Sequence, residues 1–199
     1  MGLFSDIRKI TRAYPDVRSI ARRMFVTNSL DGIVAAMGID VGGFSDKADP
    51  LLIASSIIGG TVAMGIVSGM IGVYVSERAE RMKEYKELER RVASSLKDSI
   101  YWKAARLIPV YVALWSGMGI VLFPLLIAVP YIIAASGGLS VRAAYYSSML
   151  IGLALMGFLG YFLGRVSRES IIVSVLRVLA MGVIAIVIVK LLRLGIGLG

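Results

Sequence analysis

The side chains of this sequence that could do chemistry are mainly carboxylates, because cysteine and histidine are both absent. Their absence rules out disulfides, thiolate or imidazole metal ligands, and cysteine or histidine nucleophiles. Four glutamates recur at spacings of three, four and three: Glu77, Glu80, Glu84 and Glu87. On a helix this spacing forms one stripe, which could collect a divalent cation. The alternative is a solvated face laced by ion pairs four residues apart, such as Glu77 with Arg81, and the helix alone favours this alternative.

Asp31 differs from these glutamates because it lies about two turns inside an apolar stretch. A carboxylate inside a bilayer costs on the order of 3 kcal/mol on insertion scales, so it should face a partner, water or an ion. The alternative is that Asp31 sits at the membrane interface and caps a helix or pairs with Arg22 or Arg23. Three other aspartates are expected at or near the outer surface, either solvated or receiving a released cation: Asp40, Asp46 and Asp49.

Methionine and glycine supply the remaining candidates. A thioether is a soft ligand that helps to select a transition metal, and three methionines are candidates for this role: Met37, Met64 and Met70. For any single methionine, filling a gap in a packed surface is the commoner role. The second apolar stretch also carries glycines spaced for close helix packing, which predict a dimer interface: Gly65, Gly69 and Gly72.

The elements that must position these residues are transmembrane helices. The composition is 57% hydrophobic, and the mean hydropathy of +0.80 is far above that of soluble domains. We therefore expect an all-α integral membrane protein with about five transmembrane helices, at residues 24–44, 50–76, 104–135, 141–164 and 171–192. Pro124 and Pro130 predict a kink and an irregular outer end in the third. The alternative is six spans, with the third stretch folded as a re-entrant pair.

Two helical segments are expected outside the bilayer. Residues 1–23 form an amphipathic segment on the inner membrane surface, with a stripe at Leu3, Ile7, Ile10 and Tyr14 that Pro15 ends. Residues 24–199 form the five-helix domain, and its insert at 77–103 extends the second helix into the cytoplasm. No long apolar run follows the first basic residues before Thr27, so a cleavable signal peptide is not expected.

The distribution of Lys and Arg along the sequence predicts the orientation of the protein in the membrane. Lys and Arg concentrate in residues 1–23 and 77–103, which places the amino terminus in the cytoplasm of a multi-pass protein of the cell membrane. The net charge of +9 therefore reports topology, and nucleic acid is not an expected partner.

Two segments resemble the vacuolar iron transporter family: Asp31-Gly32-Ile33-Val34 and Gly72-Val73-Tyr74-Val75-Ser76-Glu77-Arg78. The resemblance covers residues 28 to about 195. It implies a homodimer that exports Fe²⁺ or Mn²⁺ from the cytoplasm in exchange for protons, with the ion path between the first two helices of both protomers. Asp31 matches the first-helix aspartate of the family, whereas Val73 stands where the family commonly has glutamate, and Met70 lies one position from the expected methionine.

The predicted mechanism uses the glutamate stripe to concentrate the cation and Asp31 to bind it within the bilayer, helped by one of the candidate methionines. Proton exchange at Asp31 would drive release. No constellation for hydrolysis or group transfer is visible, so we do not expect an enzyme, and the metal is cargo with no resident cofactor. Two alternatives are a membrane scaffold or assembly protein whose basic helices bind lipid or a soluble partner, and a passive cation channel.

Overall fold

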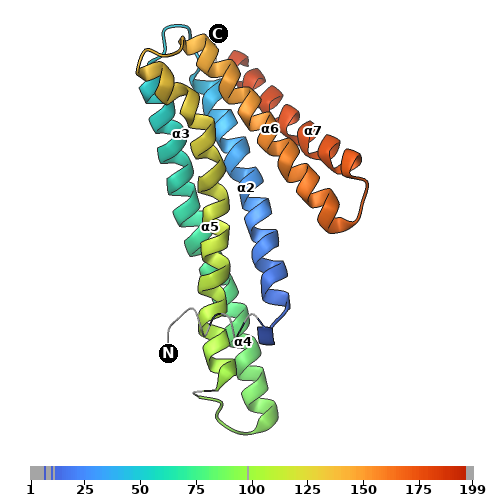
Figure 1. Ribbon diagram of the computed structural model, residues 1–199. Helices are drawn as coiled ribbons and strands as arrows, with labels where there is room; N and C mark the ends of the chain where they lie inside the picture. Colours follow the sequence, from blue (N-terminus) through green and yellow to red (C-terminus); the bar gives the residue numbers. More distant parts are fainter. Residues whose placement is uncertain (1–6, 8–9, 11, 98, 196–199) are drawn as a thin grey trace. The chain divides into compact units, whose positions relative to one another are not determined.

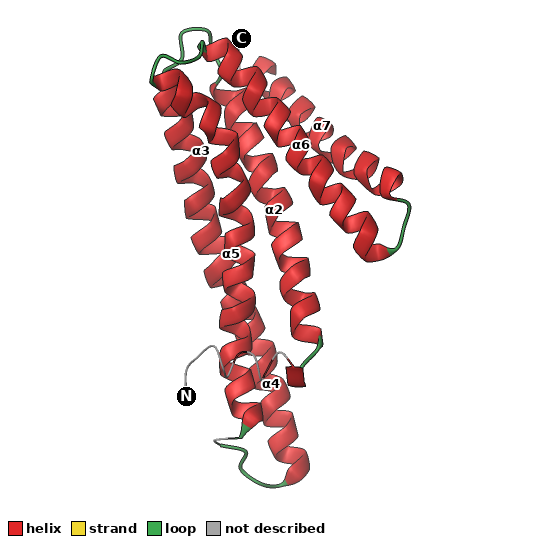
Figure 2. Ribbon diagram, viewed as in Figure 1, coloured by secondary structure: helices red, strands yellow, loops and turns green. Residues whose placement is uncertain are grey.

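The computed structural model describes all residues except 1–6, 8–9, 11, 98 and 196–199. The described residues form helices joined by short loops (Figure 2), which agrees with the all-α prediction. The elements are α2 (Asp16–Gly43), α3 (Pro50–Met64), η1 (Gly65–Gly72), α4 (Val73–Val92), α5 (Ile100–Ala135), α6 (Val141–Ser167) and α7 (Ile171–Gly195). Since α3, η1 and α4 are continuous, the described part of the chain contains five helices long and apolar enough to cross a membrane. The predicted number of spans is therefore confirmed at the level of length and composition.

The helix boundaries follow local capping chemistry. The Asp49 carboxylate accepts a hydrogen bond from the Leu51 amide at 2.9 Å, and Pro50 occupies the first position of α3, where its missing N–H is not needed. The Ser140 hydroxyl oxygen likewise accepts from the Ala143 amide at 3.2 Å at the start of α6. Short polar side chains before an apolar run thus set where these helices begin.

The second helix projects beyond its apolar part, as the sequence predicts. It runs without interruption from Pro50 to Val92 and ends where Ala93 adopts a left-handed conformation with φ 51°. Its middle, η1, is an eight-residue π-helix with three glycines, which the sequence analysis did not predict. Glycine lowers the preference for regular α-helix, and π segments of this kind often occur near functional sites.

Helix α5 differs from the prediction of an irregular outer end in the third span. α5 is a single helix of 36 residues that continues through Pro124 and Pro130 to Ala135, so the irregular outer end and the re-entrant pair are wrong. Both proline side chains are buried, and long apolar helices tolerate proline where protein packs around it. At 1.5 Å per residue α5 is about 54 Å long, well beyond the roughly 30 Å of a bilayer core.

The chain divides into two compact units, the first comprising Met1–Asn28 and Met64–Gly119. Here α4 and the beginning of α5 form an antiparallel hairpin (Figure 1), with the rings of Tyr85 and Trp102 5.2 Å apart. The buried core of this unit contains Ile10, Val17, Ala21, Ala104, Ile108 and Val112. The predicted break at Pro15 is confirmed, because a turn there precedes α2. Of the amphipathic stripe, Leu3 lies outside the described residues, whereas Ile10 packs in this core.

The second unit comprises Ser29–Ala63 and Ile120–Gly199. Within it α6 and α7 form a long antiparallel hairpin (Figure 1), and they approach closely at Gly160, where a Cβ would lie 2.8 Å from the Val175 Cα. Only 17% of the most hydrophobic stretch of α7 is buried by the rest of the protein. An apolar helix exposed to this extent suits a lipid environment and would be a liability in water.

Candidate functional site

Asp31 lies on an exposed face of α2. The next residue, Gly32, is buried against α5, where an added Cβ would overlap the backbone carbonyl of Ile120. The ion pairs among the described residues centre on Arg81, Arg142 and Arg177, and none of them includes Asp31. Asp31 is therefore an exposed carboxylate beside a tightly packed glycine.

The glutamate stripe on α4 is partly occupied by arginine. Arg81 is only 8% exposed and donates to three carboxylates: Glu77 at 3.0 Å, Glu84 at 3.1 Å and Asp16 at 2.9 Å. The predicted pair of Glu77 with Arg81 is thus present. Two of the four stripe carboxylates already have a cationic partner, which reduces the negative potential available to a metal ion.

The other two stripe residues, Glu80 and Glu87, are exposed. The ion pairs within the described part of the chain do not include one between Glu87 and Arg91. Instead, Glu87 and Arg91 both line a pocket. The described ranges also hold no group of three or more carboxylates placed to bind a metal ion together.

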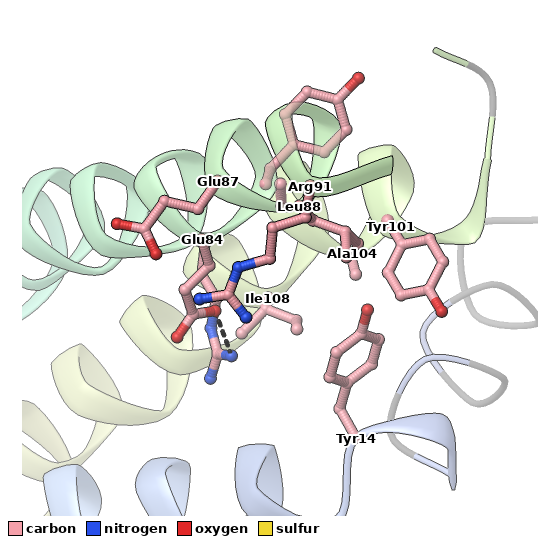
Figure 3. Close-up of a pocket in the computed structure, with 11 residues that line it drawn as sticks. Tyr14, Glu84, Glu87, Leu88, Arg91, Tyr101, Ala104 and Ile108 are labelled. Carbon is pink, nitrogen blue, oxygen red and sulfur yellow. Dashed lines mark hydrogen bonds and ion pairs between the residues drawn. The ribbon is translucent and has the colours of Figure 1, made fainter. Parts of the chain in front are cut away.

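The pocket lies in the first unit and has a volume of about 310 Å³. Its charged wall comes from α4, with Glu84, Glu87 and Arg91, and its apolar floor comes from α5 (Figure 3). Tyr14 and Tyr101 stand at the opposite side, and burial is the largest cause that raises the pKa of the Tyr14 phenol above its usual range. Because acidic and basic side chains are mixed on this wall, it should attract a bare cation only weakly.

The candidate methionines have packing roles in the structure. Met37 is 1% exposed and fills a notch at Gly152, where an added Cβ would lie 2.7 Å from its sulfur. It also lies six residues from Asp31, which on a helix is a different face. Met70 packs over Gly117 of α5 in the same manner. Met64 is half-buried.

The candidate dimer glycines are used within the chain. Gly65 and Gly69 are buried, and a Cβ at Gly117 of α5 would lie 3.2 Å from the Gly65 carbonyl oxygen. Gly72 is exposed. The close helix approach at Gly65 therefore involves α5 of the same chain, and dimerisation through the three glycines stays a prediction.

Sequence reasoning misplaced Asp40, which is fully buried in the second unit. Tyr131 of α5 donates to one of its oxygens, and Ser148 of α6 donates to the other at 2.5 Å. The burial of Asp40 could have been predicted from its spacing. Asp40 lies nine residues after Asp31 and therefore projects from the opposite side of α2. If one of the two carboxylates faces outward, the other must face the core.

Asp46 forms another polar contact at this end of the second unit. Arg142 donates to it through Nη2 at 2.7 Å and through Nε at 3.2 Å. The hydrogen bonds from Arg142 hold the pKa of the Asp46 carboxyl below its usual range. This exposed pair ties the loop after α2 to the first turn of α6.

Comparison with known proteins gives one informative similarity. No family model matches the chain. The chain is similar to the uncharacterized protein MJ0645 of Methanocaldococcus jannaschii, with 29% identity over 170 residues that cover 83% of this chain and 84% of that protein. No solved structure matches.

Proposed function

We propose that this protein is a multi-pass protein of the cell membrane that moves a divalent transition-metal ion, Fe²⁺ or Mn²⁺, out of the cytoplasm. Asp31 is its ligand within the bilayer. The proposal draws support from five helices of membrane-spanning length and from the resemblance of two segments to the vacuolar iron transporter family. Metal is the cargo in this proposal, and proton exchange is the proposed driving reaction.

The observation that carries the proposal is the outward-facing carboxylate of Asp31. Asp31 lies eight residues after Arg23 and twelve before Gly43, which at 1.5 Å per residue corresponds to about 12 Å and about 18 Å along α2. It therefore lies well within the apolar part of the helix. An ionisable side chain at such a depth needs water, an ion or a partner helix, because lipid cannot solvate it.

A second copy of the chain would most simply supply the metal ligands that this site lacks. One carboxylate is too few ligands for a divalent cation, whereas two Asp31 side chains across a two-fold axis, together with water, supply a set of oxygen ligands. The thioether of Met37 is not part of this proposed set, because it is engaged at Gly152. Val73 does not contribute either, because it packs against the apolar core of the first unit.

Flux measurements on Asp31→Asn test the proposal. Asparagine keeps the shape and polarity of the side chain but removes its charge, so uptake of Mn²⁺ or Fe²⁺ into proteoliposomes should fall to the level of empty vesicles. Asp46→Asn is the matched control, because it removes an exposed carboxylate from the same unit and should retain parental flux. Parental flux in a folded Asp31→Asn variant would overturn the assignment.

The driving force is tested by the same vesicles with and without a pH gradient. A carrier coupled to protons should accumulate metal against its gradient, whereas a passive channel should only equilibrate it. A scaffold is the second candidate function, and the binding of Arg81 to two stripe carboxylates favours it. The absence of flux for every metal tested would support the scaffold.

A further inference from the structure

Asp40 is a carboxylate that the proposed metal site does not use. It is fully buried, three residues before the end of α2, between hydroxyl groups from two other helices. Burial of a charge without a neutralising partner is unfavourable, so the state of this group depends on what surrounds it.

Cationic side chains do not donate to Asp40 among the residues that the structure describes. α3 has no ionisable residue at all. On α6, Arg142 donates to Asp46, and Tyr145 and Tyr146 contribute phenol groups and no cation. On α7, Arg177 pairs with Glu169, and Lys190 is exposed. The part of α5 in this unit contributes only Tyr131 as an ionisable group.

The hydrogen-bond partners of Asp40 can serve both of its protonation states. When the carboxyl is ionised, the hydroxyls of Tyr131 and Ser148 both donate to it, as in the structure. When it is protonated, its O–H can donate to the Ser148 oxygen, because a hydroxyl is both donor and acceptor. The Ser148 hydrogen can then turn to the carbonyl of Ala144, four residues earlier on the helix. Neither state leaves a buried polar group unpaired.

We propose that Asp40, Tyr131 and Ser148 form a proton-binding site within the second unit, at which one proton binds and leaves reversibly. The ligand is H⁺, and its acceptor is a carboxylate oxygen of Asp40. The site is separate from Asp31, which lies on the opposite face of α2. Its test requires no transport, so the proton site and the proposed metal function can fail independently.

Infrared difference spectroscopy of the full chain in lipid bilayers tests this site directly. With ¹³C-labelled aspartate carboxyl groups, stepping the pH from acid to alkaline should show a protonated aspartate C=O band that disappears and returns reversibly. Asp40→Asn should remove this band. Asp46→Asn should retain it, because that carboxylate is exposed and outside the site.

A second variant keeps the proposal testable even if Asp40→Asn does not fold. Ser148→Ala removes one donor to the ionised carboxylate, so the protonated band should persist to a pH about one to two units higher. A carboxylate that only clamps the helices would show no such shift. The proposal is overturned if the parent protein shows no titrating aspartate band, if the band survives Asp40→Asn, or if Ser148→Ala leaves its midpoint unchanged.

Discussion

Gly32 sets the distance between α2 and α5. Its position opposite the Ile120 carbonyl leaves no room for a methyl group, and the obstacle is backbone, which cannot rotate away. The glycine beside Asp31 therefore has a packing reason that is independent of any transport role.

Gly32→Ala should destabilise the protein by about 1–3 kcal/mol, since inserting a methyl group into a packed contact forces a backbone shift. Chemical unfolding in detergent, followed by circular dichroism, measures the change. Gly42→Ala is the control on the same helix, because nothing lies within 4 Å of its Cβ position. That variant should be neutral or gain up to about 1 kcal/mol from its better helix propensity. Equal effects at the two positions would contradict the packing role.

The ion pair between Asp46 and Arg142 should make the stability of the protein depend on pH. Because the folded-state pKa of Asp46 lies below its usual 3.8, the pair contributes stability above that value and loses it as pH falls through the lower, folded value. Arg142→Gln should therefore raise the pKa of Asp46 toward its usual value. Carboxyl ¹³C chemical shifts in labelled protein measure this, with Arg177→Gln as the control that should leave Asp46 unchanged.

At the scale of elements, α4 is organised by Arg81. An isolated helix with four glutamates along one stripe would repel itself, and the buried guanidinium offsets this repulsion by bridging α4 to Asp16 at the start of α2. The local pair of Glu77 with Arg81 was predictable from spacing. The contact with Asp16, 65 residues away, was not, because only the fold brings the two together.

Arg81→Gln should expose the competition between arginine and metal on this helix. With the positive charge removed, Glu77, Glu84 and Asp16 should bind Mn²⁺ more tightly. We expect a gain of roughly two- to fivefold, because the Asp16 and Glu84 side chains are 51% and 55% exposed and water screens charge pairs at that exposure to about 1 kcal/mol or less. Electron paramagnetic resonance of free Mn²⁺ measures the affinity. Arg78→Gln is the matched control, because that side chain bonds to the Tyr74 hydroxyl at 2.5 Å. Equal affinities in the parent and Arg81→Gln would show that Arg81 does not compete with metal on this helix.

Periodicity and length predicted the helices well and their interruptions poorly. The five apolar stretches were visible because each exceeds the length that a bilayer requires. The continuity of α5 through Pro130 and the π-helix at Gly65 were not predicted, because local propensity does not contain the surroundings of a helix in the folded protein. The spacing of Asp40 from Asp31 was visible in the sequence, but its hydroxyl partners were not, because they come from α5 and α6.

At the scale of the whole molecule, topology is the property that tests the charge distribution. The helix from Pro50 to Val92 separates two exposed positions, Ser45 before it and Ser95 after it. Because the chain has no cysteine, a single cysteine at either position gives an unambiguous label. A membrane-impermeant reagent added outside intact cells should modify Ser45→Cys and spare Ser95→Cys. The reverse pattern would invert the orientation, and labelling of both would contradict a span between them.

The π-helical segment η1 has a consequence for the time-dependent behaviour of the second helix. Its wide turns and three glycines make its backbone hydrogen bonds easier to break than those of α3, so Gly65–Gly72 should exchange amide hydrogens for deuterium faster than Pro50–Met64. Local opening there would let the helix lengthen, shorten or rotate about its axis without melting either flanking segment. The second helix would then behave as two rigid helical segments joined by a flexible π-helical segment.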